Sequence, residues 1–115
     1  MITVGVDIEN INRFKKIIDD DNFLNKIFTP KEIDYCFSKK NIERHLAVRF
    51  AGKEATIKAF CSMYDKLLDF KNIEITNNSL GVPKVKVHTD ESIDISISLS
   101  HSMDNAIAYV HMEKL

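Results

Sequence analysis

The sequence predicts an α+β protein in which a mostly antiparallel sheet packs on one long helix. The helix is indicated by apolar residues that recur at helical spacing from about Ile42 to Tyr64. The sheet is indicated by residues that alternate with a period of two at the start of the chain and again beyond Ile73. A length of 115 residues suits one domain, so we expect residues 1–115 to fold as a single unit.

Composition and charge argue against several classes of protein. Apolar residues make up 44% and charged residues 29% of the chain, the balance of an ordinary globular protein. The 16 basic and 17 acidic side chains give a net charge of −1, which supplies no general attraction to nucleic acid. No apolar stretch is long enough to span a bilayer, and the first residues lack the pattern of a secretion signal. We therefore expect a cytoplasmic protein that binds neither nucleic acid nor membrane.

The first element is a strand with one buried and one open face. Its apolar residues alternate with polar or small ones. These apolar residues are Ile2, Val4, Val6 and Ile8. Asp7 falls on the opposite face, near the point where the chain turns into a helix. Taken alone, such a residue is more often a solvated or capping aspartate than a functional one.

Three short helical segments are expected next. The first begins after Asn10 or Asn12, either of which can cap it, and the second lies around residues 23–28. The third has a strong start signal in Thr29-Pro30-Lys31-Glu32, whose threonine caps the helix and whose glutamate completes a capping box. We expect this third helix to turn three apolar residues inward: Ile33, Cys36 and Phe37.

The long helix carries a charged pair beside small residues. Glu54 and Lys58 are four residues apart, where the ordinary interpretation is a surface ion pair worth about 0.3–0.5 kcal/mol. Ala47 and Ala51 next to them predict a shallow groove, in which a ligand or another surface could approach the helix.

Lys53 is an anomaly of the same helix, because it falls inside the apolar stripe. An unpaired buried lysine is costly, so this side chain must either reach solvent or find an anionic partner such as a phosphate. With Arg49 and Lys58 it surrounds Glu54 with positive charge, as a polyphosphate site requires.

Strands are expected in the last part of the chain. Alternating apolar residues predict them around residues 73–75, 85–87, 93–99 and 106–110, with a turn at 80–83 and a hairpin connection over 100–105. His101 falls in that connection, where a histidine is more often structural than functional. The histidines show no metal-ligand spacing, which argues against a zinc site.

Three blocks of sequence carry a further signal. They are Gly5-Val6-Asp7-Ile8, Arg49-Phe50-Ala51-Gly52-Lys53-Glu54-Ala55 and Ser98-Leu99-Ser100-His101-Ser102. In this order and spacing they resemble the signature of the holo-acyl-carrier-protein synthases, small 4′-phosphopantetheinyl transferases, across essentially the whole chain. The resemblance implies that family's fold. It also implies transfer of the 4′-phosphopantetheine group from coenzyme A to a serine of an apo acyl carrier protein, with release of adenosine 3′,5′-bisphosphate.

The same resemblance implies roles for individual residues. Asp7 and Glu54 match the carboxylates that hold Mg²⁺ against the coenzyme A pyrophosphate, and oxygen ligands suit this cation. Lys58 matches a residue near the phosphates and is the third catalytic candidate. The residues expected to bind coenzyme A are Arg49, Lys53, Lys58, Gly81, Pro83, Ser100 and His101, the last four in turns that flank the adenosine.

Two groups could accept the proton of the attacking serine. A metal-bound water oriented by Glu54 is the first candidate, because a cation acidifies its water. Lys58 is the alternative, and it would have to be uncharged to serve as a base.

Assembly and partner follow from the resemblance as well. Family members of this short type usually form trimers with each active site between neighbouring subunits. The carrier protein is acidic around its serine, so the basic residues of the first helix are the expected docking surface. These residues are Arg13, Lys15 and Lys16, for which an ordinary solvated helix face is an equally good interpretation. The acidic run at 19–21 would repel such a partner if it faced the same way.

One departure from the family favours a different class of protein. Family members often have a glycine-rich loop after the long helix, where this chain has Cys61-Ser62-Met63-Tyr64-Asp65. A protein that binds coenzyme A without turning it over is therefore the alternative to an enzyme. The presence of both Asp7 and Glu54 argues against that alternative. The enzyme hypothesis requires these two carboxylates to meet in the folded chain.

Overall fold

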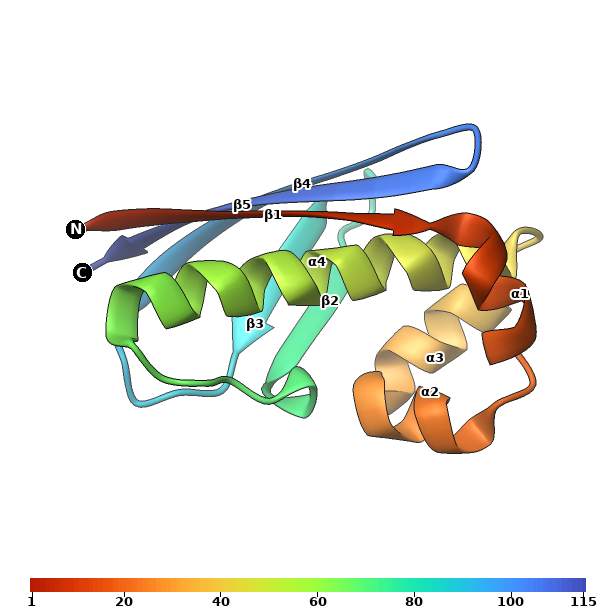
Figure 1. The fold of residues 1–115 in the computed structure, drawn as a ribbon, viewed down its shortest axis with the longest axis horizontal. Coiled ribbons are helices and arrows are strands. Elements are labelled where there is room, and N and C mark those ends of the chain that lie inside the picture. Colours follow the sequence, from red (N-terminus) through yellow and green to blue (C-terminus); the bar gives the residue numbers. More distant parts are fainter.

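One long helix organises the structure. In the computed structural model, which describes residues 1–115, α4 spans Ile42–Tyr64, the bounds that the sequence predicts. Strands cross one side of this helix, and three short helices gather near its N-terminal end (Figure 1). The prediction of an α+β fold with antiparallel strands packed on a long helix is confirmed.

The other elements follow the predicted order. They are β1 (Ile2–Asn10), η1 (Ile11–Arg13), α1 (Phe14–Ile17), α2 (Asp21–Ile27), α3 (Pro30–Phe37), η2 (Phe70–Asn72), β2 (Ile73–Asn77), β3 (Pro83–Val87), β4 (Ile93–Ser102) and β5 (Asn105–Lys114). The larger sheet has the strand order β1-β5-β4, and the smaller one pairs β2 with β3. All of these pairs are antiparallel.

The first strand alternates as predicted, but its buried face is the other one. Val4, Val6 and Ile8 are 51%, 52% and 61% exposed, whereas Gly5 is buried and Asp7 is on the face toward α4. The cause is the absence of a side chain at Gly5, where a Cβ atom would lie 1.9 Å from the Ala55 carbonyl oxygen. Strand and helix backbones therefore approach too closely for large side chains to lie between them.

The predicted groove beside the charged pair is filled by this same packing. Ala47 and Ala51 are completely buried, and Ala51 packs in one cluster with Ala108 and Val110 of β5. The small residues of α4 admit the protein's own sheet, so this prediction of an open groove was wrong.

The first and third short helices begin where the sequence predicts, whereas α2 begins at Asp21, two residues before the predicted segment, because Asp20 caps it. Asn10 caps η1 by accepting a hydrogen bond from the backbone N–H of Asn12, 2.8 Å away. Thr29 and Glu32 form the predicted capping box at the start of α3. Of the residues expected to face inward from α3, Phe37 does not, because it ends the helix and is 39% exposed.

The last hairpin is tighter than predicted. β4 continues through Ser102, so Ser100 and His101 are strand residues that pair with Ile107 and Ala106, and the turn lies at 103–104. Polar side chains on the outer face of a strand do not interrupt backbone pairing, which is why the sequence pattern ended the strand too early. None of the helices is both long and apolar enough to cross a membrane.

Candidate active site

An acidic cluster forms where β1 lies along α4. Lys58 on α4 donates a hydrogen bond to the backbone carbonyl of Val6 at 2.9 Å, and its Nζ lies 3.4 Å from Asp7 Oδ1. Thr3, on the same face of β1, donates a hydrogen bond to the Ala59 carbonyl at 2.7 Å. These contacts fix the register of strand against helix and bring Asp7 over the turn that carries Lys58. The ordinary Glu54–Lys58 ion pair does not form, since Lys58 reaches β1 instead.

The carboxylates of this cluster affect one another. Burial and then the charge of Asp7 raise the pKa of Glu54. Burial and the neighbouring charge of Asp7 raise the pKa of Glu9 to about 7, against the opposing charge of Arg13. The structure thus brings together Asp7 and Glu54, as the sequence requires, and adds Glu9.

One carboxylate oxygen of Asp7 lacks a hydrogen-bond donor. Its Oδ2 is buried and has no hydrogen-bond partner. A buried carboxylate oxygen without a donor is costly and calls for a cation or a ligand. No three His, Cys, Asp or Glu side chains come together so as to hold a metal ion by themselves. The donor set still suits Mg²⁺, which commonly binds to one or two carboxylates and completes its shell with water and substrate phosphates.

A pocket of about 230 Å³ lies on another part of the surface. Four of the residues predicted to bind the nucleotide converge there, namely Arg49, Gly81, Pro83 and His101. Its other lining residues are Tyr35, Arg44, His45, Val48, Asn77 and Leu99. The pocket therefore combines α3, α4, the β2–β3 hairpin and the end of β4.

Arg49 is held at the pocket while part of its guanidinium remains unpaired. Its guanidinium donates a hydrogen bond to the side-chain oxygen of Asn77 and stacks 4.0 Å from the centre of the Tyr35 ring. Asn77 in turn donates to the Gly81 carbonyl at 2.9 Å, which ties the hairpin to the arginine. The Nε of Arg49 is buried without a partner, so a donor remains for an anionic ligand.

The acidic cluster and the pocket lie on different sides of α4. Arg49 and Glu54 are five residues apart, which rotates their side chains by roughly 140° around the helix axis. Neither Asp7 nor Glu54 lines the pocket. One chain therefore displays two half-sites, an acidic one and a basic one.

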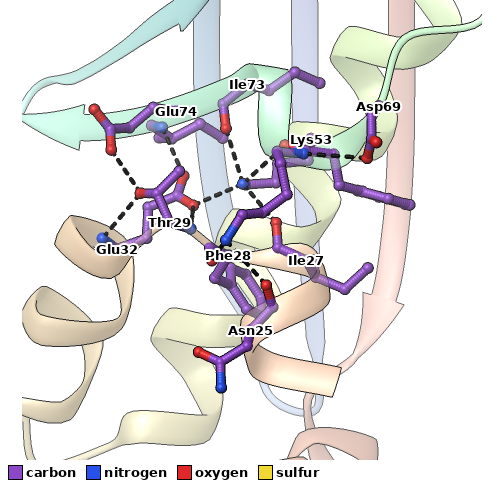
Figure 2. Close-up of polar contacts among 12 residues, drawn as sticks. Asn25, Ile27, Phe28, Thr29, Glu32, Lys53, Asp69, Ile73 and Glu74 are labelled. Atoms are coloured by element: carbon purple, nitrogen blue, oxygen red, sulfur yellow. Dashed lines mark hydrogen bonds and ion pairs between the residues drawn. The ribbon is translucent and has the colours of Figure 1, made fainter. Parts of the chain in front are cut away.

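Lys53 does not serve either half-site, which corrects its predicted role in binding coenzyme A. It is fully buried, and Figure 2 shows its amine among backbone carbonyls and the Glu32 carboxylate. The amine lies 2.6 Å from Glu32 Oε1 and donates hydrogen bonds to the carbonyls of Ile27 (2.8 Å), Phe70 (3.2 Å) and Ile73 (2.9 Å). Of the alternatives for this lysine, the anionic partner is correct, but the anion is a glutamate and no proton remains for phosphate.

Two further predicted positions differ from expectation. Ser100 lies outside the pocket, because the alternation of β4 turns it to the face opposite Leu99 and His101. Arg13 is tied down by an ion pair with Glu9 at 3.0 Å, and its guanidinium lies over the rings of Phe14 and Phe50. Lys15 and Lys16 are exposed on α1.

Several residues of the two half-sites were missed from the sequence. Glu9 carried a usable signal, since it is two residues from Asp7 and therefore on the same strand face. His45 also did, being one turn before Arg49 on the same helix face. Tyr35 and Asn77 gave no such signal, because only the tertiary fold brings them to the pocket.

The fold and these two half-sites define a class of protein: a small α+β protein with paired carboxylates and a separate basic pocket. A sequence model of the 4′-phosphopantetheinyl transferase superfamily matches residues 3–110. The holo-[acyl-carrier-protein] synthase of Thermodesulfovibrio yellowstonii is 50% identical over 93% of this chain and 94% of its own length. That of Cytophaga hutchinsonii is 40% identical over 96% of each chain.

Solved structures agree with these relatives. A structure described as the ACPS–CoA complex of Chronobacterium ammoniagenes has a TM-score of 0.85 and 26% identity, and the match covers 100% of this chain and 98% of that one. The Bacillus anthracis holo-(acyl-carrier-protein) synthase, in complex with CoA (3′,5′-ADP), has a TM-score of 0.82 at 30% identity, with 98% and 96% covered. This chain belongs to the holo-[acyl-carrier-protein] synthase family of phosphopantetheinyl transferases.

Proposed function

We propose that this protein is a Mg²⁺-dependent holo-acyl-carrier-protein synthase. It transfers 4′-phosphopantetheine from coenzyme A to a serine of an apo acyl carrier protein and releases adenosine 3′,5′-bisphosphate. The observation that supports this most is the buried, partnerless Oδ2 of Asp7 in an acidic cluster with Glu54. Such an atom is expected where a cation and a phosphorylated substrate complete the site.

The basic pocket is the proposed site of the nucleotide end of coenzyme A. Two structural relatives are described as complexes with coenzyme A. Arg49 offers its free donor and its charge to a phosphate, while Gly81, Pro83 and His101 line the rest of the pocket. The shape and charge of this pocket suit a nucleotide with several phosphates.

Asp7 and Glu54 are the residues that would hold Mg²⁺ in this proposal. The cation, when bound, neutralises charge that develops at the phosphorus being transferred. Lys58, anchored between the Val6 carbonyl and Asp7, adds a positive charge beside the same carboxylates. Its two acceptor contacts suit a charged ammonium rather than a base.

Glu54 is therefore the residue that we favour for handling the serine proton. Burial raises the pKa of Glu54 in the metal-free protein, but a bound cation would lower it, so Glu54 would orient a water that takes the proton and would not act as the base itself. The serine oxygen forms a bond to the β-phosphorus, the phosphorus–oxygen bond to the nucleotide breaks, and the serine proton would pass to a water that Glu54 orients.

The two half-sites would be joined by assembly. The outer face of β1 and β5 exposes contiguous apolar side chains, and Val6 lies opposite Tyr109 and Ile8 opposite Ile107 in the strand register. We propose that this face packs against other copies of the chain in a trimer, so that the acidic half-site of one subunit meets the basic half-site of the next. Val6→Glu should then yield a monomer by light scattering. A trimeric Val6→Glu variant would contradict the proposed interface.

The acceptor in this proposal is an acidic carrier protein docked on α1. Lys15 and Lys16 are exposed and free to steer it, while Arg13 is already paired with Glu9. We also propose a cytoplasmic location for this reaction.

Incubation with coenzyme A, Mg²⁺ and an apo acyl carrier protein tests the function directly. Mass spectrometry should show the carrier gaining the mass of one phosphopantetheine group, and omission of Mg²⁺ should abolish the gain. If several apo carriers gain no mass while coenzyme A still binds, the alternative of a binding protein without turnover is correct.

A further inference from the structure

His45 is a pocket residue to which no role has been given. It lies on α4 one turn before Arg49, lines the pocket and is partly buried. Its ring meets that of Tyr35 from α3 edge-on, with the ring centres 5.8 Å apart. The imidazole is thus fixed in orientation at a surface that a ligand would touch.

The groups that act on His45 are three permanent cations and a second histidine. Arg44 and Arg49 come from α4, Lys39 from the connection between α3 and α4, and His101 from β4. The β2–β3 hairpin contributes Asn77, Gly81 and Pro83 to the pocket, which carry no charge, and α3 contributes the Tyr35 phenol. A second positive charge on the imidazole would be repelled from several sides, so His45 is neutral in the free protein near neutral pH.

We propose that His45 takes up a proton when coenzyme A enters the pocket and then binds the ligand as a charged contact. This inference rests on the proposed function, because it takes coenzyme A as the ligand of the pocket. A ligand with several phosphates cancels the repulsion from the surrounding cations and adds an attraction of its own. Both changes favour the imidazolium, so the charge is created only in the complex.

The coupling makes ligand binding depend on pH in a way that a permanent cation at this position would not. The free protein avoids packing one more positive charge beside Arg49, while a polyanionic ligand still gains a charge-assisted hydrogen bond. A neutral nucleoside gains nothing from it. Affinity must then fall as pH rises, by up to about tenfold per pH unit between the pKa of His45 in the free protein and its higher value in the complex. Burial and the cationic neighbours lower the free value to about 4.

Calorimetry of coenzyme A binding measures the proton directly. Titrations at pH 6 in two buffers of different ionisation enthalpy give the number of protons taken up per coenzyme A bound. The ligand phosphates are the same in both titrations, so the comparison is between the wild type and His45→Gln. We expect the wild type to take up close to one more proton than His45→Gln, and to bind coenzyme A about tenfold more tightly at that pH.

His88→Gln is the matched control, because His88 is exposed beyond the end of β3 and does not line the pocket. It should behave as the wild type in both proton count and affinity. A measurement on the wild-type protein removes any dependence on how the variant folds. At pH 6, the ring carbon signals of His45 in an NMR spectrum should move to the imidazolium position when coenzyme A is added.

The outcomes separate this inference from the function on which it rests. Equal proton uptake by the wild type and His45→Gln, or a ring that stays neutral in the complex, would overturn the role of His45 while leaving coenzyme A binding intact. A wild-type protein that shows no binding of coenzyme A would overturn the proposed function and this inference together.

Discussion

Lys53 and Glu54 are neighbours on α4, yet the structure treats their charges in opposite ways. Lys53 is sealed in the interior, and every proton of its amine has an acceptor on Glu32 or on a backbone carbonyl. Glu54 faces a second carboxylate, Asp7, whose Oδ2 has no donor at all. The folded chain satisfies the hydrogen-bonding groups around Lys53, but it leaves the acidic cluster of Asp7 and Glu54 without a compensating charge or donor for Oδ2 of Asp7.

The difference separates a structural role from a functional one. A fully satisfied buried ion pair ties elements together, and Figure 2 shows that the Lys53–Glu32 pair joins the end of α2, the start of α3 and β2. A cluster of carboxylates that repel one another costs stability. The chain keeps that cost where a cation and a substrate would remove it. Proximity in sequence is therefore no guide to shared function on this helix.

The largest expected effect comes from breaking the buried Lys53–Glu32 ion pair. Lys53→Met leaves Glu32 charged and buried, and three carbonyls lose a donor, so the free energy of unfolding should fall by about 3–5 kcal/mol. Urea denaturation measures this loss. Lys58→Met is the matched control, since the same change on the exposed side of α4 should alter stability by less than about 1 kcal/mol. Equal losses for the two variants would refute the contrast.

The reverse pattern is expected for the acidic cluster, where a substitution should reduce activity without reducing stability. Glu54→Gln removes a repulsion with Asp7, so the variant should unfold at the same or a higher temperature than the wild type without metal. Its transfer rate should fall by more than about 100-fold, because direct ligands matter more than the outer groups that cost 10–100-fold. The check is thermal unfolding beside a carrier-loading assay. A variant that loses stability and activity in parallel would show that Glu54 is structural.

The sequence predicted α4 and the capping box well because both depend on local spacing. It failed at β1, where the larger apolar side chains indicated the buried face. Gly5 reverses that choice, since a close approach to Ala55 is possible only without a side chain. The partner of Lys53 was equally out of reach, because Glu32 is 21 residues away in the chain and its capping role gave no hint of a second contact.

The sequence named residues of the candidate site but not its division into two parts. The three blocks named Asp7, Glu54 and Arg49, and the structure places the first two in one cluster and the third in the pocket. Spacing along α4 alone separates Arg49 from Glu54 by roughly 140°, so that division was available from helix geometry. Tyr35 and Asn77, which hold Arg49 in place, depend on tertiary contacts that no local pattern reports.

A smaller effect is expected from a substitution that keeps the positive charge of Arg49 but removes its planar guanidinium. Arg49→Lys retains the positive charge, but it loses the stacking on Tyr35 and the planar donor group that reaches Asn77. Loss of a charge-assisted hydrogen bond should weaken coenzyme A binding by about tenfold or more, with little change in the rate at saturating coenzyme A. Steady-state kinetics separates the two, as a higher KM for coenzyme A at nearly constant kcat. A fall in kcat alone would place Arg49 with the carboxylates instead.

A last expected effect is a pH dependence of stability that comes from His45 in the pocket and not from Lys53 or Glu54. The pKa of His45 falls from its usual value near 6.5 to about 4 on folding, so between these values the unfolded chain binds more protons. The contribution of His45 to stability therefore rises with pH across this window, levels off above about 6.5, and is lost as pH falls toward 4. His45→Gln removes this contribution, so its free energy of unfolding should depend less steeply on pH than that of the wild type, while His88→Gln keeps the wild-type slope. Denaturation curves at pH 4.5, 5.5 and 6.5 in the absence of ligand make the comparison, and identical slopes for wild type and His45→Gln would show that the cations around the pocket do not act on this ring.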